Sequence, residues 1–385
     1  MRPLASWTNH VAASGTMEVS RAIDELRQQG KKIISLSVGE PDFPTPPHIV
    51  EAAVRSLRHG DTHYAPPQGI EEFREAISQR FREKNGVECT ADDVLVTPAK
   101  HAIFMALATL VDRDDEVLIP DPSWVSYAPQ TVFLGGKSVL VPFGERFEVD
   151  EEALKNAITP RSKVYVLNNP SNPLGKVFSE NELRIIRDLA VDHDLYVVAD
   201  EVYERLVYEG KHVSIASLPG MWERTVTVCG LSKSYAMTGW RVGWAIGPRE
   251  IISPMLKIQE HTITCLPRFA QEAGIAALRG SQSVVREMRE EFRKRRDLVL
   301  SLLENIPGIN VNRPQGAFYV FPSYDLPTPS VEFAKDLLRE EQVAVTPGSA
   351  FGPRGEGHFR ISYASSEEEI REGLLGIKRF MERRL

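Results

Sequence analysis

The 385-residue chain lacks the features that mark several specialised classes of protein. Its three cysteines, Cys89, Cys229 and Cys265, are spaced too widely for a disulfide framework or a zinc site. No apolar run approaches the roughly 18 residues of a membrane helix, and residues 1–15 lack the continuous apolar core of a secretory signal. These absences predict a soluble, cytoplasmic protein.

The chain also lacks a strong excess of one charge. It has 46 Lys and Arg residues against 53 Asp and Glu residues, and no basic stripe that could bind a phosphate backbone. Nucleic acid is therefore not an expected partner. There is no internal repeat, low-complexity tract or flexible linker, and the length allows two or three domains with a large core.

The middle of the chain alternates between short apolar runs and helical patterns. Strands that are apolar throughout and separated by helices are typical of a mostly parallel sheet with both faces covered, so we predict an α/β fold. A last strand at 242–246 is expected to close the sheet in an antiparallel direction. The other predicted strands are 94–97, 116–119, 138–141, 163–167, 195–199 and 225–229, and the helices between them are 101–111, 123–134, 151–158 and 179–193.

The two ends of the chain predict a second, smaller unit. The N-terminal side has a helix at 17–29, a strand at 32–37 and helices at 47–59 and 70–84, and the C-terminal side has a long amphipathic helix at 282–304 before an α+β segment at 308–385. We therefore expect an arm and helix at 1–46 that contribute to the small domain, a large domain at 47–281 and a small domain at 282–385.

Lys233 follows the buried strand 225–229 in the stretch TVTVCGLSKSYAMTGWRVG. Open α/β sheets bind their ligands at the carboxyl ends of the strands, and an amine there can be partly desolvated. Such an amine can attack a carbonyl group. The alternative from this stretch alone is an ordinary solvated loop lysine.

Two other strands also end in polar residues. Asp200 directly follows the apolar strand 195–199, where a carboxylate is costly unless it is paired, so we expect it to be buried beside a positive group rather than solvated. Asn172 follows strand 163–167 in an Asn-Pro-rich turn, which either fixes its side chain for binding or serves only as a turn.

Several residues are suited to an anionic ligand. The turn from Thr97 to Lys100 leads into a helix, whose free amide groups bind phosphate well, and Arg241 offers a planar, bidentate donor. Trp124 lies near the start of the next predicted helix. Its side chain either packs in the core or forms a flat platform for an aromatic ring. Arg360 is flanked by apolar residues in the strand-like segment 358–363, where a guanidinium without a partner is suited to a carboxylate ligand.

Six motifs together resemble the class I/II aminotransferases, which are fold type I pyridoxal-phosphate enzymes. They most resemble the prokaryotic branch that includes aspartate and aromatic aminotransferases. The resemblance implies a homodimer with shared active sites, a large domain with a seven-stranded sheet, and no metal. The motifs are SLSVGEPDFPTP (35–46), YAPPQG (64–69), NNPSNPLG (168–175), DEVY (200–203), SKSYAMTGWRVGW (232–244) and HFRISYA (358–364).

The resemblance also implies a role for each candidate residue. Lys233 bonds to the cofactor aldehyde and then moves a proton, and Asp200 keeps the pyridine nitrogen protonated. Around the ring, Tyr203 and Asn172 bind its phenolic oxygen and Trp124 stacks on it. The phosphate is bound by the amides of Ala99 and Lys100, by Arg241 and by Tyr64 of a neighbouring subunit, and the substrate carboxylate by Arg360 with help from the backbone at Gly39.

Two positions depart from the family pattern. The phosphate loop looks one residue short beside relatives with two glycines before the lysine, and its Pro98 has no amide hydrogen to donate. Gly230 stands where many relatives have a phosphate-binding serine. Ser232 is the candidate to supply the missing hydroxyl.

The expected reaction moves an amino group between an amino acid and a 2-oxo acid, with aspartate and 2-oxoglutarate as the leading pair. In the branch that the chain resembles, a lysine that matches Lys100 reaches the distal carboxylate of the substrate, with Ser14 and Thr16 as possible helpers; the alternative is that Lys100 only balances the phosphate. Other readings are an aromatic- or alanine-specific enzyme and a carbon–sulfur lyase. A transcription regulator is disfavoured, because about 15 residues before the first helix are too few for a DNA-binding domain.

Overall fold

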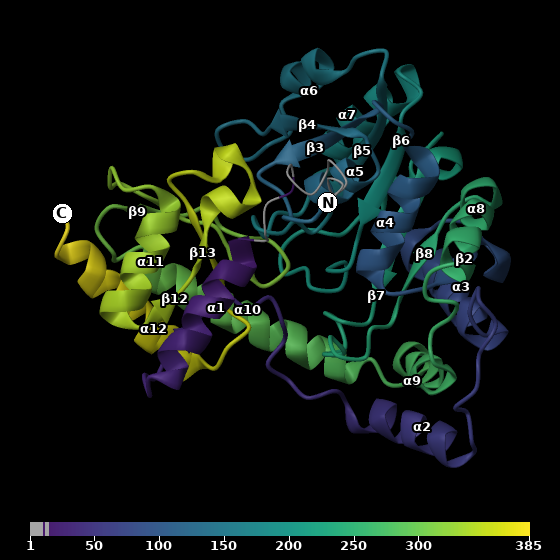
Figure 1. Cartoon of the computed structure of the whole chain (residues 1–385), viewed down its shortest axis with the longest axis horizontal. Coiled ribbons are helices and arrows are strands. Elements are labelled where there is room, and N and C mark those ends of the chain that lie inside the picture. The colour runs from purple at the N-terminus through teal and green to yellow at the C-terminus, as the bar shows by residue number, and fades with distance from the viewer. Residues whose placement is uncertain (1–10, 12–14) are drawn as a thin grey trace, which may run out of the picture.

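The computed structural model describes residue 11 and residues 15–385, and its largest element is a seven-stranded sheet (Figure 1). Neighbouring strands are parallel except β8, which runs antiparallel to both of its neighbours. The strands in spatial order are β2 (Val94–Val96), β8 (Gly243–Ile246), β7 (Thr225–Gly230), β6 (Tyr196–Asp200), β5 (Ser162–Asn168), β3 (Glu116–Asp121) and β4 (Lys137–Pro142).

Helices cover both faces of this sheet. Alternate residues of each strand point to opposite sides, and both sets are apolar and buried beneath helices. On β5, Val164 and Val166 pack in one cluster with α4 and α8, whereas Tyr165 and Leu167 pack in another with α7. The helices of this part are α2 (Pro47–Arg58), α3 (Glu71–Asn85), α4 (Ala99–Leu110), α5 (Tyr127–Phe133), α6 (Glu151–Ala157), α7 (Glu180–Asp192), α8 (Arg249–Glu260) and α9 (Arg268–Arg279).

Local sequence signals explain several helix ends. The helix α7 begins with a capping box, in which Ser179 and Glu182 each bond to the other's backbone N–H group. The helix α3 ends at Gly86, whose φ of 69° is the left-handed conformation that glycine adopts without strain.

A second part of the chain packs around its own core. In Figure 1, α1, α11 and α12 lie together on the left, and α10 runs from them toward the sheet. Its helices are α1 (Gly15–Gln28), α10 (Ser283–Leu303), α11 (Ser330–Glu341) and α12 (Glu367–Glu382), and its strands are β1 (Ile34–Ser35), β9 (Ile309–Asn310), β10 (Tyr319–Val320), β11 (Ser323–Tyr324), β12 (Val343–Ala344), β13 (Thr346–Pro347) and β14 (Phe359–Ser362).

These short strands form three small sheets. The strand β1 pairs in parallel with β12, β11 pairs with β9, and β14 lies between β10 and β13 in antiparallel pairs. Short 3₁₀ helices complete the chain at η2 (Ala91–Asp93), η3 (Ile215–Ser217), η4 (Trp222–Arg224), η5 (Gly348–Phe351) and η6 (Pro353–Gly355). The N-terminal strand β1 therefore completes a sheet with a segment more than 300 residues later in the chain.

Three expectations about the elements need correction. The strand β8 runs antiparallel as predicted, but it lies inside the sheet between β7 and β2 rather than closing it. The helix predicted at 123–134 begins only at Tyr127, because the N–H of Ser123 donates to the carbonyl of Phe351 at 2.9 Å and keeps the preceding turn extended toward η5. The strand predicted at 32–37 is confined to β1, two residues long.

Other expectations are confirmed. Cys89, Cys229 and Cys265 are free thiols. Among the residues that the structure describes, no helix has the length and apolar character needed to cross a membrane. The α/β architecture with a mostly parallel seven-stranded sheet is the one that the strand pattern predicted.

Candidate active site

A cavity of about 530 Å³ lies where β5, β6 and β7 end and α4 begins. Parallel strands bring the residues that follow them to one edge of the sheet, so side chains far apart in sequence meet here. The segments around β1, β10, β13 and β14 close the opposite side. Of the predicted site residues, the cavity is lined by Gly39, Ala99, Lys100, Trp124, Asn172, Asp200, Tyr203, Ser232, Lys233, Arg241 and Arg360.

The remaining predicted residues do not line this cavity or lie outside the described residues. Tyr64 is 88% exposed on the loop before α3, so within one chain its side chain has little contact with the rest of the protein. Ser14 lies outside the residues that the structure describes, and the side chain of Thr16 is also outside them.

Lys233 projects into the cavity from the turn after β7. Its Nζ donates to the carbonyl oxygen of Gly39 at 2.5 Å. Burial, together with the positive charge of Arg360, lowers the pKa of Lys233 from its usual 10.5 to about 8. The amine is therefore largely neutral in mildly alkaline solution, and a neutral amine is the form that attacks a carbonyl carbon.

Asp200 ends β6 and is 5% exposed. Burial raises its pKa from 3.8 to about 6, although a hydrogen bond from the hydroxyl of Tyr127 at 2.7 Å and one from the amide of Val202 at 3.3 Å oppose this shift. Asp200 is buried as predicted, but the prediction of a directly paired cation is wrong. No described Lys, Arg or His forms an ion pair with Asp200, and Lys233 acts on it only at longer range. A buried carboxylate with only neutral donors can accept a cationic ligand.

Tyr127 is a site residue that the sequence analysis missed. It lies at the start of α5, 73 residues before Asp200, and it is 1% exposed. A tyrosine in an apolar helix indicates core packing, and only the meeting of α5 with β6 turns its hydroxyl into a partner for the carboxylate. No sequence signal specific to Tyr127 could have found this contact.

The other end of the cavity is positively charged. The helix α4 begins at Ala99, two residues earlier than predicted, so the amides of Ala99 and Lys100 lie in its first turn, whose N–H groups have no partner inside the helix. Arg241 lies nearby, and its Nη1 donates to the carbonyl of Thr238 at 2.7 Å. Lys100 and Arg241 line the same cavity, and burial together with the charge of Arg241 lowers the pKa of Lys100. This arrangement suits a phosphate group.

The structure explains the glycine that departs from the family pattern. A Cβ atom at Gly230 would lie 3.0 Å from both the Cα of Gly243 and the carbonyl oxygen of Val242. A serine would therefore require the backbone of residues 242–243 to shift by a few tenths of an ångström. Ser232 lines the cavity two residues later and offers a hydroxyl in the same region.

Trp124 and Asn172 both line the cavity. The ring of Trp124 has Lys100 Nζ over its face, 4.9 Å from the centroid, and contacts Tyr127 edge to face with centroids 5.2 Å apart. Asn172 is held in its turn because its backbone N–H donates to Asn168 Oδ1 at 2.7 Å. Trp124 is therefore a cavity wall and not only core, as one of the two readings expected.

Arg360, on β14, is a buried cation whose hydrogen-bond partners are all neutral. It is 4% exposed, and it donates to Asn172 Oδ1 at 2.9 Å, to the carbonyl of Ser37 at 2.6 Å and to Thr346 Oγ1 at 3.3 Å. No described carboxylate pairs with it, as the sequence pattern suggested, and burial lowers its pKa. A buried guanidinium that lacks a counter-ion favours an anionic ligand.

Comparisons with known proteins agree with this geometry. The family model "Aminotransferase class I and II" matches residues 31–377. Aspartate aminotransferase of Bacillus subtilis (strain 168) is 41% identical, with 99% of each chain covered, and aromatic-amino-acid aminotransferase 2 of Thermococcus litoralis is 44% identical, with 92% of this chain and 93% of the relative covered. The structure of Thermus thermophilus aspartate aminotransferase with maleate has a TM-score of 0.94 at 42% identity, and covers 98% of this chain and 100% of its own.

The match covers both parts of the fold and nearly the whole chain. It confirms the resemblance that the six motifs indicated and the α/β fold that the strand pattern predicted. The chain belongs to the class I and II aminotransferases, and its activity is that of an aminotransferase.

Proposed function

We propose that the protein binds pyridoxal 5′-phosphate in this cavity and moves an amino group from an L-amino acid, with aspartate favoured, to a 2-oxo acid such as 2-oxoglutarate. One observation carries the proposal: Lys233, an amine with a pKa of about 8, shares one cavity with Arg360, a buried guanidinium without a carboxylate partner among the described residues. The amine suits the aldehyde of the cofactor, and the guanidinium suits the carboxylate that every substrate carries.

The donor set of the cavity fits this cofactor from end to end. The first amides of α4 and the side chains of Arg241 and Ser232 would bind the phosphate, and Asp200 would bind the protonated pyridine nitrogen. Tyr203 and Asn172 would bind the phenolic oxygen, and Trp124 would cover the ring face. When bound, the cofactor supplies an aldehyde that takes the amino group and a ring that accepts the electrons left on the substrate α-carbon.

The residues of the chain then have distinct tasks. Arg360 holds the α-carboxylate with two parallel hydrogen bonds and so orients the α-carbon toward Lys233. Lys233, as a neutral amine, would take the proton from the substrate α-carbon, hold it on Nζ and give it back later in the amino-group transfer. Asp200 stays ionised against the cationic ring nitrogen, because an adjacent positive charge lowers the pKa of a carboxylate.

Lys100 is the candidate residue for the substrate side chain. Its ammonium lies over Trp124, at the cavity wall, and is free of any carboxylate within the described part of the chain. Relatives named aspartate aminotransferase, and a related structure with the dicarboxylate maleate, support a dicarboxylic substrate. A relative named for aromatic amino acids is as similar in sequence, so aromatic donors are the second candidate.

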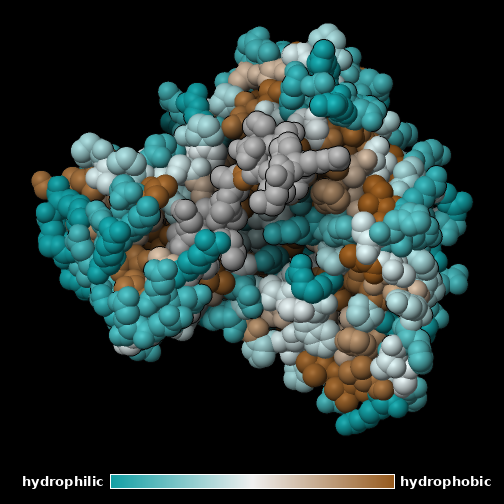
Figure 2. Space-filling model, viewed as in Figure 1, coloured by the Kyte–Doolittle hydropathy of each residue, from teal (hydrophilic) through white to brown (hydrophobic). Residues whose placement is uncertain are grey.

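We also propose that the active unit is a homodimer in which Tyr64 reaches the phosphate of the partner's site. Tyr64 is 88% exposed, and Val50 and Leu57 of α2 are 36% and 44% exposed. Figure 2 shows an apolar area at the lower edge of the molecule, where Figure 1 shows α2. An exposed aromatic residue near an apolar helix face favours an interface.

A panel of amino donors with 2-oxoglutarate tests the proposal. Purified protein loaded with pyridoxal phosphate is mixed with aspartate, glutamate, phenylalanine, tyrosine or alanine, and the oxo-acid products are quantified. We expect oxaloacetate from aspartate to form fastest. Ammonia and pyruvate formed without an acceptor would instead indicate a lyase, and faster turnover of phenylalanine would assign the aromatic reading.

A further inference from the structure

Tyr319, on β10, contacts two residues for which different tasks are proposed. Its hydroxyl oxygen lies 2.9 Å from that of Tyr203, and its ring lies beneath the guanidinium of Arg360, with the Cζ atom 4.5 Å from the ring centroid. Tyr319, Tyr203 and Arg360 are 1%, 4% and 4% exposed. Water therefore competes little with either contact.

The hydroxyl contact bears on the direction in which Tyr203 donates. Burial raises the pKa of both tyrosines, so both phenols keep their protons at neutral pH. If Tyr319 donates to Tyr203, the proton of Tyr203 is left to point into the cavity. Tyr203 can then donate to a ligand oxygen without losing its own hydrogen-bond partner.

The ring contact bears on the orientation of the guanidinium. The guanidinium of Arg360 lies over two aromatic rings, with its Cζ atom 4.5 Å from the centroid of Tyr319 and 4.9 Å from that of Phe351. A planar cation packed against aromatic faces is restricted in tilt, and the attraction to each face is strongest where water is excluded. The two rings therefore restrict the tilt of the Arg360 guanidinium. The hydrogen bonds to Ser37 and Asn172 fix its rotation within that plane.

Tyr319 also packs against the backbone that contacts the lysine. A side chain at Gly39 would collide with the Tyr319 hydroxyl, so only glycine allows this approach. The carbonyl of Gly39 in turn accepts the hydrogen bond from Lys233. Tyr319 therefore touches three parts of the cavity wall.

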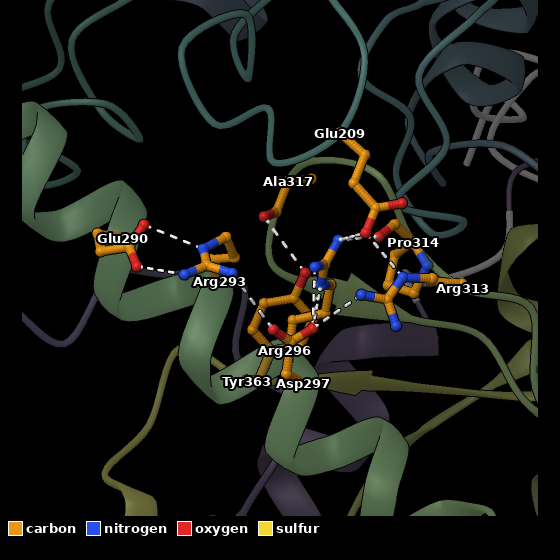
Figure 3. A network of polar contacts seen from close by, with 9 residues as sticks. All are labelled: Glu209, Glu290, Arg293, Arg296, Asp297, Arg313, Pro314, Ala317 and Tyr363. Carbon is orange, nitrogen blue, oxygen red and sulfur yellow. Dashed lines mark hydrogen bonds and ion pairs between the residues drawn. The ribbon is translucent and has the colours of Figure 1, made fainter.

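The segment that leads into β10 is itself firmly held (Figure 3). Arg296, which is 1% exposed, donates to the carbonyl of Pro314 at 3.0 Å and pairs with Glu209 at 2.9 Å. The hydroxyl of Tyr363 donates to the carbonyl of Ala317 at 3.4 Å. A side chain on such a braced segment can hold its neighbours in a fixed geometry.

We propose that Tyr319 is a positioning residue that acts on both the cofactor and the substrate: its hydroxyl directs the proton of Tyr203 toward the cofactor oxygen, and its ring fixes the plane of Arg360 against the substrate carboxylate. The inference rests on the proposed function, since it needs both ligands. It goes beyond that function because one residue from the second part of the chain contacts both the tyrosine proposed for the cofactor oxygen and the arginine proposed for the substrate carboxylate.

Two substitutions separate the two contacts. Tyr319→Phe removes the hydroxyl but keeps the ring, and Tyr319→Leu removes both. For each holoenzyme we would titrate the visible absorbance of the Lys233-bound cofactor with pH, and measure the dissociation constant of maleate, which does not react, by calorimetry. Tyr324→Phe is the matched control, because Tyr324 is buried in the same part of the chain, bonds to the carbonyl of Thr328 at 2.7 Å and does not line the cavity.

We expect Tyr319→Phe to raise the midpoint of the absorbance titration by about half a pH unit or more, because a weaker bond from Tyr203 favours the protonated cofactor oxygen. Its maleate dissociation constant should stay within about twofold of wild type, whereas Tyr319→Leu should raise that constant by about fivefold to tenfold. Tyr324→Phe should change neither quantity.

An unchanged midpoint in Tyr319→Phe would overturn the hydroxyl role, and this variant keeps its ring packing, so the test does not depend on the leucine variant folding. Weaker maleate binding in Tyr319→Phe, equal to that in Tyr319→Leu, would overturn the ring role. A wild-type protein that gains no visible absorbance with pyridoxal phosphate would overturn the proposed function itself, and this inference with it.

Discussion

The two sides of the cavity are built in different ways. The side that carries Asp200 and Lys233 is the carboxyl edge of one continuous sheet, where Asp200 ends β6 and Lys233 lies in the turn after β7. The side that carries Arg360 and Tyr319 is assembled from short strands of the second part of the chain. The first side is positioned by regular topology, and the second by contacts between distant segments, so the first should tolerate change in its surroundings better than the second.

The largest effect is expected at the sheet edge, with Lys233→Ala. Turnover should fall by at least about 10⁴-fold, because the residue that both bonds the cofactor and moves the proton is lost. Borohydride treatment of the wild type should fix the cofactor on a peptide that contains Lys233. Lys211→Ala, at an exposed lysine away from the cavity, is the control and should be normal. Label on another lysine would remove the centre of the proposal.

Asp200→Asn should have the next largest effect on turnover. The neutral amide no longer holds a proton on the pyridine nitrogen, so we expect a rate at least about 100-fold lower, or roughly 3 kcal/mol in the barrier. The control is Glu223→Gln, which changes an exposed carboxylate away from the cavity. Near-normal turnover in Asp200→Asn would show that another group protonates the ring.

The same substitution should stabilise the cofactor-free protein. The pKa of Asp200 is raised from 3.8 to about 6 in the folded chain, so the folded state holds this proton more tightly than the unfolded state. The ionised carboxylate therefore costs stability above pH 6, and the cost vanishes below about pH 4, where both states are protonated. Asp200→Asn should raise the free energy of unfolding by up to about 3 kcal/mol at pH 7 and by little at pH 4, as measured by urea unfolding.

The contrast between the two sides also separates what the sequence predicts from what it does not. Apolar strands followed by polar turns predicted the sheet and placed Asn172, Asp200 and Lys233 at one edge, because parallel strands all end on the same side. The direction of β8 was predicted, but its place in the sheet was not. Strand order depends on packing between elements, which the local pattern does not contain.

On the other side, the residue pattern indicated Arg360, since a charged residue within an apolar strand is conspicuous, and the family resemblance added Gly39. The Arg360 neighbours Thr346 and Tyr319 were missed, and so was Tyr127 beside Asp200. Each is a common residue type in a setting that fits an ordinary core. Their roles arise from contacts between segments remote in sequence, so only the folded chain reveals them.

Arg360→Lys tests the second side directly. The lysine keeps the positive charge but loses the paired hydrogen bonds and the planar contact with the rings, so kcat/KM should fall by about 10- to 100-fold. Every donor should suffer to a similar degree, because all share the α-carboxylate. A defect confined to acidic donors would place this arginine at the substrate side chain instead.

Lys100→Ala should give a more selective loss. A charge pair in a water-poor site is worth about 1 to 3 kcal/mol, so the kcat/KM for aspartate and glutamate should fall by about ten- to hundredfold while that for phenylalanine and alanine is spared. The four donors, measured side by side, are each other's controls. An equal fall for all four would show that Lys100 serves the cofactor phosphate, and the preference for aspartate would lose its main support.

The smallest effect is expected for Tyr127→Phe, which tests what sets the pKa of Asp200 at the sheet edge. The variant keeps the edge-to-face contact with Trp124 but removes the hydroxyl that donates to Asp200. That bond lowers the pKa of Asp200, so its loss should raise the pKa above about 6.

The cationic ring binds the ionised carboxylate, and cofactor affinity in the wild type should therefore fall as the pH drops through about 6. In Tyr127→Phe the fall should begin at a higher pH, with an affinity about threefold to tenfold lower than wild type at pH 6 and little changed at pH 8. Fluorescence titration of the cofactor-free protein at both pH values measures this. Tyr165→Phe, a buried tyrosine that packs with α7 and does not line the cavity, is the control. Equal affinities at pH 6 would mean that the charge of Asp200 is set by Lys233 across the cavity and not by the hydroxyl beneath it.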